Sequence, residues 1–251
     1  MILQIESISK AFGGIHALND VSINIKKGQI YGVIGPNGAG KSTLFQIISG
    51  VLKPDSGEII FDNTAITGFP SHKVSRVGIG YVFQESFLFD DMTLFENMLV
   101  SGNTPLNNGL LSLLPFYQSK KAEQFKKKIR DTLKIFGLDM KTELFPGHLS
   151  YGDRRRALIA HVLINGASLI LLDEPSAGMN SIEREELSND ILGMQKNGHT
   201  IIIIEHNLRL IMGICDSISV LNFGRVICQG TPGEISNDES VIEAYIGKKS
   251  G

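Results

Sequence analysis

Residues 35–42 read Gly35-Pro36-Asn37-Gly38-Ala39-Gly40-Lys41-Ser42. This run fits the pattern G-x-x-x-x-G-K-[ST] of a phosphate-binding loop. The apolar run 29–34 before it predicts a strand, and residues 42–49 after it have the pattern of a helix, which is the setting that such a loop requires. The alternative is a glycine-rich turn that carries Lys41 and Ser42 by chance. The strand before and the helix after favour the phosphate loop.

The residue types in this run suit a nucleoside triphosphate. Its three glycines permit the backbone angles that curl the loop, so that N–H groups converge on phosphate oxygens at a helix N-terminus. Lys41 can reach the β- and γ-phosphates, and the Ser42 hydroxyl can coordinate Mg²⁺. We therefore expect the triphosphate to be bound by residues 35–42 together with Thr43.

A second acidic element follows a predicted strand. The apolar run 169–172 ends in Asp173 and Glu174. Asp173 is suited to hold Mg²⁺ or its bound water, and Glu174 to polarise the water that attacks the γ-phosphate. An acidic turn after a buried strand would explain this hexapeptide alone. Its pairing with the phosphate loop favours a nucleotide-hydrolysing site.

Bulk composition limits the class of protein. The chain of 251 residues is 42% hydrophobic, which suits one large domain with an ample core. Its 24 Lys and Arg nearly balance 26 Asp and Glu, so nothing in the composition suggests nucleic-acid binding. Cys215 and Cys228 stand alone in apolar stretches, as ordinary thiols of a reducing compartment do.

No membrane-spanning segment is expected. The longest aliphatic runs, such as 201–204, are far shorter than the roughly 20 residues that cross a bilayer. The N-terminus has the pattern of a strand and lacks the basic flank and cleavage site of a signal peptide. We expect a cytoplasmic protein in which any membrane role comes through a partner.

The order of predicted elements indicates an α/β fold with a helical insertion. Strand patterns fill residues 1–34 and recur at 58–61 and 79–83, and helical periodicity dominates from about 86 to 165, notably at 119–136 and 153–164. Strands return at 169–172, 200–204, 218–221 and 226–228, and such aliphatic runs suit a parallel sheet covered on both faces. Residues 102–116, with Pro105 and Pro115, predict an irregular or short helical surface insert.

Together these motifs resemble the nucleotide-binding subunits of ABC transporters, over essentially the whole chain. Residues 149–153, Leu-Ser-Tyr-Gly-Asp, stand where that family has its signature, usually written LSGGQ. Gln84 matches the Q-loop glutamine, residues 176–180 match the D-loop, and His206 matches the switch histidine. The resemblance implies a P-loop NTPase core with a mainly parallel sheet, an N-terminal antiparallel β subdomain and an inserted helical subdomain.

The resemblance also implies a domain organisation. A single ABC ATPase domain would cover residues 1–251. Within it, residues 1–85 and 166–251 would form the α/β core with the N-terminal β subdomain, and residues 86–165 the helical signature subdomain.

The resemblance assigns roles to residues outside the phosphate loop. Gln84 would reach Mg²⁺ or the attacking water, His206 would contact the γ-phosphate, and Phe12 would stack on adenine. Taken singly, a histidine or glutamine at a strand end is more often structural, and Phe12 could belong to the core. The protein would be an ATPase that binds ATP and Mg²⁺. Its catalytic residues would be Glu174, His206, Lys41 and Gln84, and its Mg²⁺ ligands Ser42, Gln84 and Asp173.

The signature implies a dimer. In the resembled family, the segment that carries Ser150 and Gly152 binds the γ-phosphate of ATP held by the other subunit, at the positive end of a helix. We therefore expect a head-to-tail homodimer or heterodimer with two ATP molecules between the subunits.

This chain departs from LSGGQ at Tyr151 and Asp153. The aspartate would repel a triphosphate unless it points away or is offset by Arg154, Arg155 and Arg156. We expect these arginines to form a solvated helix face with pairing between subunits.

Several stretches, among them 150–156, 176–180 and 204–214, look like the ATPases of branched-chain amino acid uptake systems. Partners would then be membrane permease subunits, which place the chain on the inner face of the membrane, and an external substrate-binding protein. Urea uptake and lipopolysaccharide-export ATPases are close alternatives, and no residue here is expected to touch the cargo. The apolar residues between 87 and 95 would in part grip the permease and in part form the core of the helical subdomain.

Two other classes remain as alternatives. A soluble ABC ATPase acting on ribosomes or DNA repair usually has two cassettes in a chain or long coiled-coil insertions, and neither is present. A nucleotide sensor that does not hydrolyse ATP is disfavoured by the complete set of motif residues.

Overall fold

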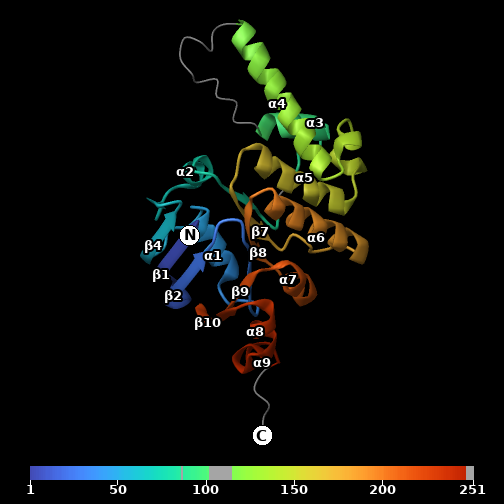
Figure 1. Ribbon diagram of the computed structural model, residues 1–251. Helices are drawn as coiled ribbons and strands as arrows, with labels where there is room; N and C mark the ends of the chain where they lie inside the picture. Colours follow the sequence, from blue (N-terminus) through green and yellow to red (C-terminus); the bar gives the residue numbers. More distant parts are fainter. Residues whose placement is uncertain (86, 102–114, 247–251) are drawn as a thin grey trace.

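The computed structural model describes residues 1–85, 87–101 and 115–246. In this part of the chain the strands form two sheets, of six and four strands. Figure 1 shows the sheets in the body of the molecule and α3, α4 and α5 gathered at one end. The predicted insert at 102–116 lies outside the described residues, except that α4 already begins at Pro115.

The larger sheet follows the order β10-β9-β3-β8-β7-β6. Its strands are β3 (Ile30–Ile34), β6 (Ile79–Val82), β7 (Leu169–Asp173), β8 (Thr200–Ile204), β9 (Ser217–Asn222) and β10 (Arg225–Gly230). All neighbours from β6 to β9 pair in parallel, which confirms the predicted parallel sheet. The strand predicted at 226–228 is confirmed as β10, but β10 is an antiparallel edge strand and only partly buried, so the expectation of a parallel strand covered on both faces is wrong there.

Both faces of this sheet are covered by apolar packing. Along β7, Leu169 and Leu171 belong to one hydrophobic cluster, and Ile170 and Leu172 belong to the other. Successive side chains of a strand point to opposite faces, so a strand covered on both sides needs an unbroken aliphatic run. The run at 201–204 in β8 follows the same rule, with its residues divided between the same two clusters.

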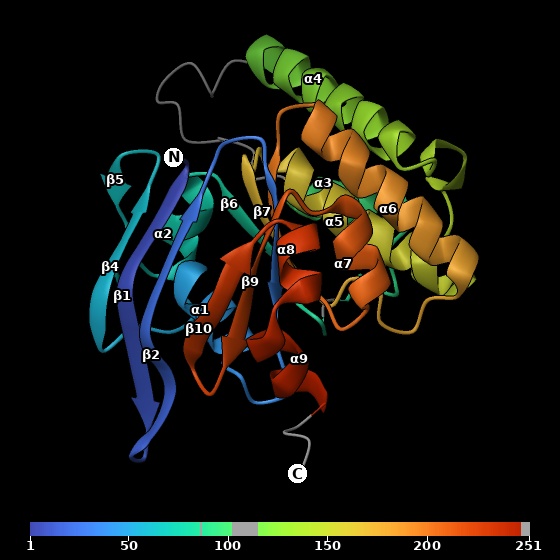
Figure 2. The ribbon, with the colours of Figure 1, turned by 60° about the horizontal axis from the view of Figure 1, so that its bottom comes forward.

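The smaller sheet is antiparallel and lies beside the larger one (Figure 2). It runs in the order β2-β1-β4-β5, with β1 (Leu3–Phe12), β2 (Ile15–Ile25), β4 (Ser56–Phe61) and β5 (Thr64–Ala65). In β2, Val21, Ile23 and Ile25 are buried and the residues between them are exposed, so one face packs on the core.

Helices surround the larger sheet and form the region at one end. The helices outside that end region are α1 (Lys41–Ile48), α2 (Ser71–Arg76), α6 (Ser181–Lys196), α7 (Leu208–Ile214), α8 (Pro232–Asn237) and α9 (Glu239–Ile246). The end region holds α3 (Leu94–Ser101), α4 (Pro115–Ile135) and α5 (Tyr151–Ile164), with short turns at Asp139–Lys141 and Pro146–His148. Among the described helices, none combines the length and the apolar character that crossing a bilayer requires.

Candidate functional site

The carboxyl ends of three neighbouring parallel strands bring the predicted motifs together. The phosphate loop follows β3, Asp173 ends β7, and His206 comes two residues after β8. Because β7 and β3 both pair with β8 in parallel, these three ends lie at one edge of the sheet. Ligands of α/β sheets bind at this edge.

The phosphate loop is shaped by close backbone approaches. A Cβ on Gly35 would lie 2.0 Å from the carbonyl oxygen of Leu221, and one on Gly40 would lie 2.4 Å from that of Ala17. Gly40 is also left-handed, with φ of 104°, where it precedes α1. Only glycine fits both positions. The loop and α1 form the floor of a cavity of about 290 Å³, lined by Ala17, Asn37, Gly38, Ala39, Gly40, Lys41, Ser42, Thr43, Glu174 and His206.

Lys41 is held back against the loop. Its Nζ donates to the carbonyl oxygens of Gly35 at 2.8 Å and Pro36 at 3.0 Å, and the residue is only 6% exposed. Burial lowers the pKa of Lys41, and the nearby carboxylates of Glu174 and Asp173 partly oppose that shift. Since an ammonium has three donors, one remains for another acceptor.

Glu174 is the centre of a hydrogen-bonded group. Its carboxylate accepts from Gln84 Nε2 at 3.0 Å and contacts His206 Nε2 at 2.8 Å. Its backbone is left-handed, with φ of 48°, and its N–H donates to the carbonyl of Ile204 at 2.9 Å. A non-glycine residue in this conformation is strained by about 1–3 kcal/mol, and such strain clusters at functional sites. Three residues assigned from separate motifs thus meet at one carboxylate.

The two carboxylate oxygens of Asp173 differ, because one accepts a hydrogen bond and the other does not. Oδ2 accepts from the Tyr81 hydroxyl at 2.8 Å, whereas Oδ1 is buried and has no hydrogen-bond partner in the described structure. Burial raises the pKa of Asp173, and the hydrogen bond from Tyr81 partly counters it. Mg²⁺ is usually held by one or two carboxylates together with phosphate oxygens. The buried, unpartnered Oδ1 and the cavity-lining Ser42 therefore fit Mg²⁺, and the described residues hold no larger cluster of metal ligands.

Glu205 is a site residue that sequence reasoning did not assign. It is 3% exposed, and its carboxylate accepts from the backbone N–H of Ser176 at 2.7 Å and of His206 at 3.2 Å. It therefore ties the segment after Glu174 to the segment that carries His206. The signal was a charged residue placed directly after four isoleucines, next to His206.

Phe12 and the signature residues do not line this cavity. Phe12 lies at the end of β1 and is 49% exposed, so the alternative of a core position is wrong. Ser150 caps α5 by accepting from the N–H of Asp153 at 3.1 Å. The N–H of Gly152 donates to Glu183 Oε1, also at 3.1 Å.

The arginine run behaves differently from the predicted solvated face. Arg154 is exposed, but Arg155 is buried and donates to the hydroxyl of Tyr151 and to the carbonyl of Phe83. Arg156 pairs with Asp153 at 2.7 Å and with Glu186 at 3.1 Å. The expected solvated face therefore holds only for Arg154, because the other two side chains turn toward neighbouring elements.

Asp153 points away from open space. It is 4% exposed and is paired with Lys141 at 2.5 Å as well as with Arg156. Burial opposes its charge, but the hydrogen bond and charge of Lys141, together with Arg156, hold the pKa of Asp153 below its usual value. Of the three arginines expected to offset an aspartate here, Arg156 alone provides that offset among the described residues.

The apolar segment after Gln84 is mixed, as expected. Phe87 and Phe89 are 84% and 59% exposed, whereas Leu94 is fully buried. Leu88 and Phe95 are partly buried and pack against the core.

The family model described as ABC transporter matches residues 18–177. The chain belongs to the ABC transporter family. A second model, described as branched-chain amino acid ATP-binding cassette transporter, matches residues 225–249. The predicted family, fold class and ATPase activity are thereby confirmed.

Relatives match this ABC protein over nearly its whole length. It is 37% identical over 252 residues to the high-affinity branched-chain amino acid transport ATP-binding protein LivG of Salmonella typhimurium, covering 98% of each chain. It is 32% identical over 246 residues to the lipopolysaccharide export system ATP-binding protein LptB of Escherichia coli, covering 98% of this chain and 97% of LptB.

Solved structures of ABC transporter cassettes have a similar fold. The ADP conformation of MJ1267, an ATP-binding cassette of an ABC transporter, matches with a TM-score of 0.87 and 34% identity, covering 98% of this chain and 99% of that one. A dimeric structure of MJ0796, a bacterial ABC transporter cassette, matches with a TM-score of 0.75 and 26% identity, covering 92% and 98%. The chain is an ATP-binding subunit of this family.

Proposed function

We propose that this subunit hydrolyses Mg²⁺-bound ATP at the cavity described above and thereby powers the uptake of branched-chain amino acids. The observation that carries the catalytic part is the position of Glu174, held by Gln84 and His206 at a cavity whose floor is the phosphate loop. Backbone N–H groups of residues 35–43, except Pro36, which has none, and the Lys41 ammonium bind the phosphates. Phe12, exposed at the end of β1, stacks on adenine.

In this mechanism the protein mainly positions groups and neutralises charge. Glu174 accepts a hydrogen bond from the attacking water and orients it toward the γ-phosphate, while Gln84 and His206 keep its carboxylate in place. Ser42, Asp173 and Gln84 would hold Mg²⁺, which when bound would supply positive charge to the phosphate oxygens.

The other half of each site belongs to a second subunit. Ser150 and Gly152 do not line the cavity of their own chain, and they begin a helix whose N-terminus favours an anion. A homodimer or heterodimer brings them to the γ-phosphate bound by the partner. The dimeric arrangement of the MJ0796 cassette supports this assembly.

The test of the catalytic proposal is Glu174→Gln. The variant keeps the shape of the side chain but loses the charge that orients water, so we expect ATP binding to persist and turnover to fall by a factor of about 10²–10⁴. Unhydrolysed ATP should then trap a dimer that elutes earlier on size-exclusion chromatography. Wild-type turnover in this variant would overturn the role of Glu174.

The cargo and partners rest on the relatives. The match of residues 225–249 and the 37% identity to LivG favour branched-chain amino acids over lipopolysaccharide export, since identity to LptB is 32%. The partners are then permease subunits at the inner face of the membrane and an external substrate-binding protein. The exposed side chains of Phe87 and Phe89 offer the permease an apolar contact.

The cargo is tested with the complete transporter in liposomes. We expect leucine-loaded binding protein to raise the ATPase rate several-fold, and the urea-loaded binding protein of a urea system to leave it unchanged. Stimulation by lipopolysaccharide alone would favour the export alternative. An ATPase rate that is the same with and without permease subunits would favour a soluble ABC ATPase.

A further inference from the structure

We propose that Tyr81 is a positioning residue for Mg²⁺ binding: its hydroxyl engages one carboxylate oxygen of Asp173 and thereby leaves the other oriented toward the metal. This inference rests on the proposed function, because it concerns the same site. It adds a residue outside the phosphate loop and the acidic motif.

The contact arises from the sheet. Tyr81 lies on β6, the edge strand that pairs in parallel with β7, and its register partner is Leu171, two residues before Asp173. Residues two apart on a strand point to the same face. The Tyr81 hydroxyl reaches Asp173 Oδ2 at 2.8 Å, and a hydrogen bond to a charged acceptor is worth about 1.5–3 kcal/mol.

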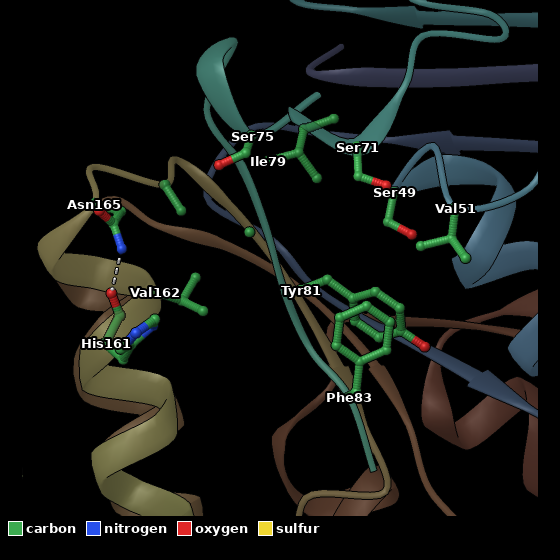
Figure 3. A pocket seen from close by; sticks show the side chains of 12 residues that line it. Ser49, Val51, Ser71, Ser75, Ile79, Tyr81, Phe83, His161, Val162 and Asn165 are labelled. Atoms are coloured by element: carbon green, nitrogen blue, oxygen red, sulfur yellow. Dashed lines mark hydrogen bonds between the residues drawn. The ribbon is translucent and has the colours of Figure 1, made fainter. Parts of the chain in front are cut away.

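The ring of Tyr81 is itself held in place. It meets Phe45 of α1 edge-on, with centroids 5.8 Å apart, and lies against Phe83 at 3.8 Å. Figure 3 shows the Tyr81 and Phe83 rings side by side, across a cavity of about 240 Å³ from His161 and Asn165 of the α5 end. Two aromatic neighbours therefore fix the direction of the hydroxyl, although a cavity adjoins the ring.

The two oxygens of Asp173 consequently differ. Oδ2 is occupied by Tyr81, and Oδ1 is buried without a partner. A buried carboxylate oxygen without a hydrogen bond is rare in folded proteins unless an ion or water completes it. Residues that orient a metal ligand typically change metal affinity by 10–100-fold when they are removed.

The discriminating substitution is Tyr81→Phe, because phenylalanine keeps the packing against Phe45 and Phe83 and removes only the hydroxyl. In a Glu174→Gln background, which suppresses hydrolysis, binding of a fluorescent ATP analogue is titrated against Mg²⁺. We expect the Mg²⁺ concentration for half-maximal binding to rise about tenfold, and the binding at saturating Mg²⁺ to be restored.

Tyr31→Phe is the matched control. Tyr31 is a buried sheet tyrosine whose hydroxyl is bonded to Ser219 Oγ at 2.6 Å, so its variant also loses a buried hydrogen bond but leaves Asp173 untouched. Its Mg²⁺ requirement should match that of the parent.

Three outcomes would overturn the inference: an unchanged Mg²⁺ requirement in Tyr81→Phe, the same shift in Tyr31→Phe, or a loss of nucleotide binding that excess Mg²⁺ does not rescue. If the Glu174→Gln parent itself binds the analogue without any dependence on Mg²⁺, the proposed function fails instead.

Discussion

Asp190 on α6 is a single residue whose burial should make stability depend on pH. Its side chain is 13% exposed, and Oδ2 lies 4.0 Å from Arg156 Nη1 without a hydrogen bond. Burial raises the pKa of Asp190 to about 6, and the adjacent charge of Arg156 only partly opposes the shift. The carboxyl group of Asp190 therefore loses its proton at a higher pH in the folded protein than in the unfolded chain.

The sign of the effect follows from proton linkage. Between the usual pKa of 3.8 and about 6, the folded state binds more protons at Asp190 than the unfolded state, so the free energy of unfolding falls as pH rises. Asparagine cannot ionise, so we expect Asp190→Asn to abolish the fall in the free energy of unfolding that Asp190 causes as pH rises. The stability of the variant relative to wild type should rise by about 2 kcal/mol between pH 4 and pH 7.

Urea unfolding at pH 4, 5, 6 and 7 measures this difference. Asp131→Asn, at an exposed position on α4, is the control for removing one carboxylate. A difference between Asp190→Asn and wild type that stays constant with pH, or that falls as pH rises, would contradict the linkage argument.

At the scale of elements, the sequence predicts well where one local pattern determines the structure. The runs 169–172 and 201–204 became β7 and β8 because a strand packed on both faces needs aliphatic residues at every position. The phosphate loop and α1 were predictable because three glycines and a following helical pattern are a local signal. Edge position is not local, so the antiparallel pairing of β10 was missed.

The same distinction holds in the site. Glu174 could be predicted from its place after an apolar strand paired with the phosphate loop, whereas Gln84 and His206 could be predicted only through the family resemblance. Tyr81 could not be assigned, because its partner Asp173 lies 92 residues away in sequence. Glu205 left a local signal as a charged residue after an aliphatic run, but its contact with Ser176, 29 residues away, could not be predicted. The burial and pairing of two arginines were unpredictable for the same reason. Arg155 donates to the carbonyl of Phe83, and Arg156 faces Glu186 and Asp190 on α6, so their partners lie in other parts of the chain.

Across the whole molecule, the two halves of the proposed ATP site lie in different parts of the chain. The cavity belongs to the core, and Ser150 and Gly152 begin α5 in the helical region (Figure 1). In this structure the N–H of Gly152 is taken by Glu183 Oε1, whose other oxygen accepts from Asn180 N–H in the capping box of α6. A carboxylate therefore occupies the helix N-terminus at which the partner's γ-phosphate is proposed to bind.

Dimer closure should then require the phosphate to compete with Glu183. Glu183→Gln retains a side-chain oxygen for the α6 cap but weakens a charged hydrogen bond to a neutral one, a change of about 1 kcal/mol. In the Glu174→Gln background we expect about fivefold less ATP to give half-maximal dimer on size-exclusion chromatography. Glu185→Gln, at an exposed position on the same helix, should leave that concentration unchanged. If Glu183→Gln needs as much ATP as its parent, or more, Glu183 is part of the α6 cap and does not compete with the phosphate.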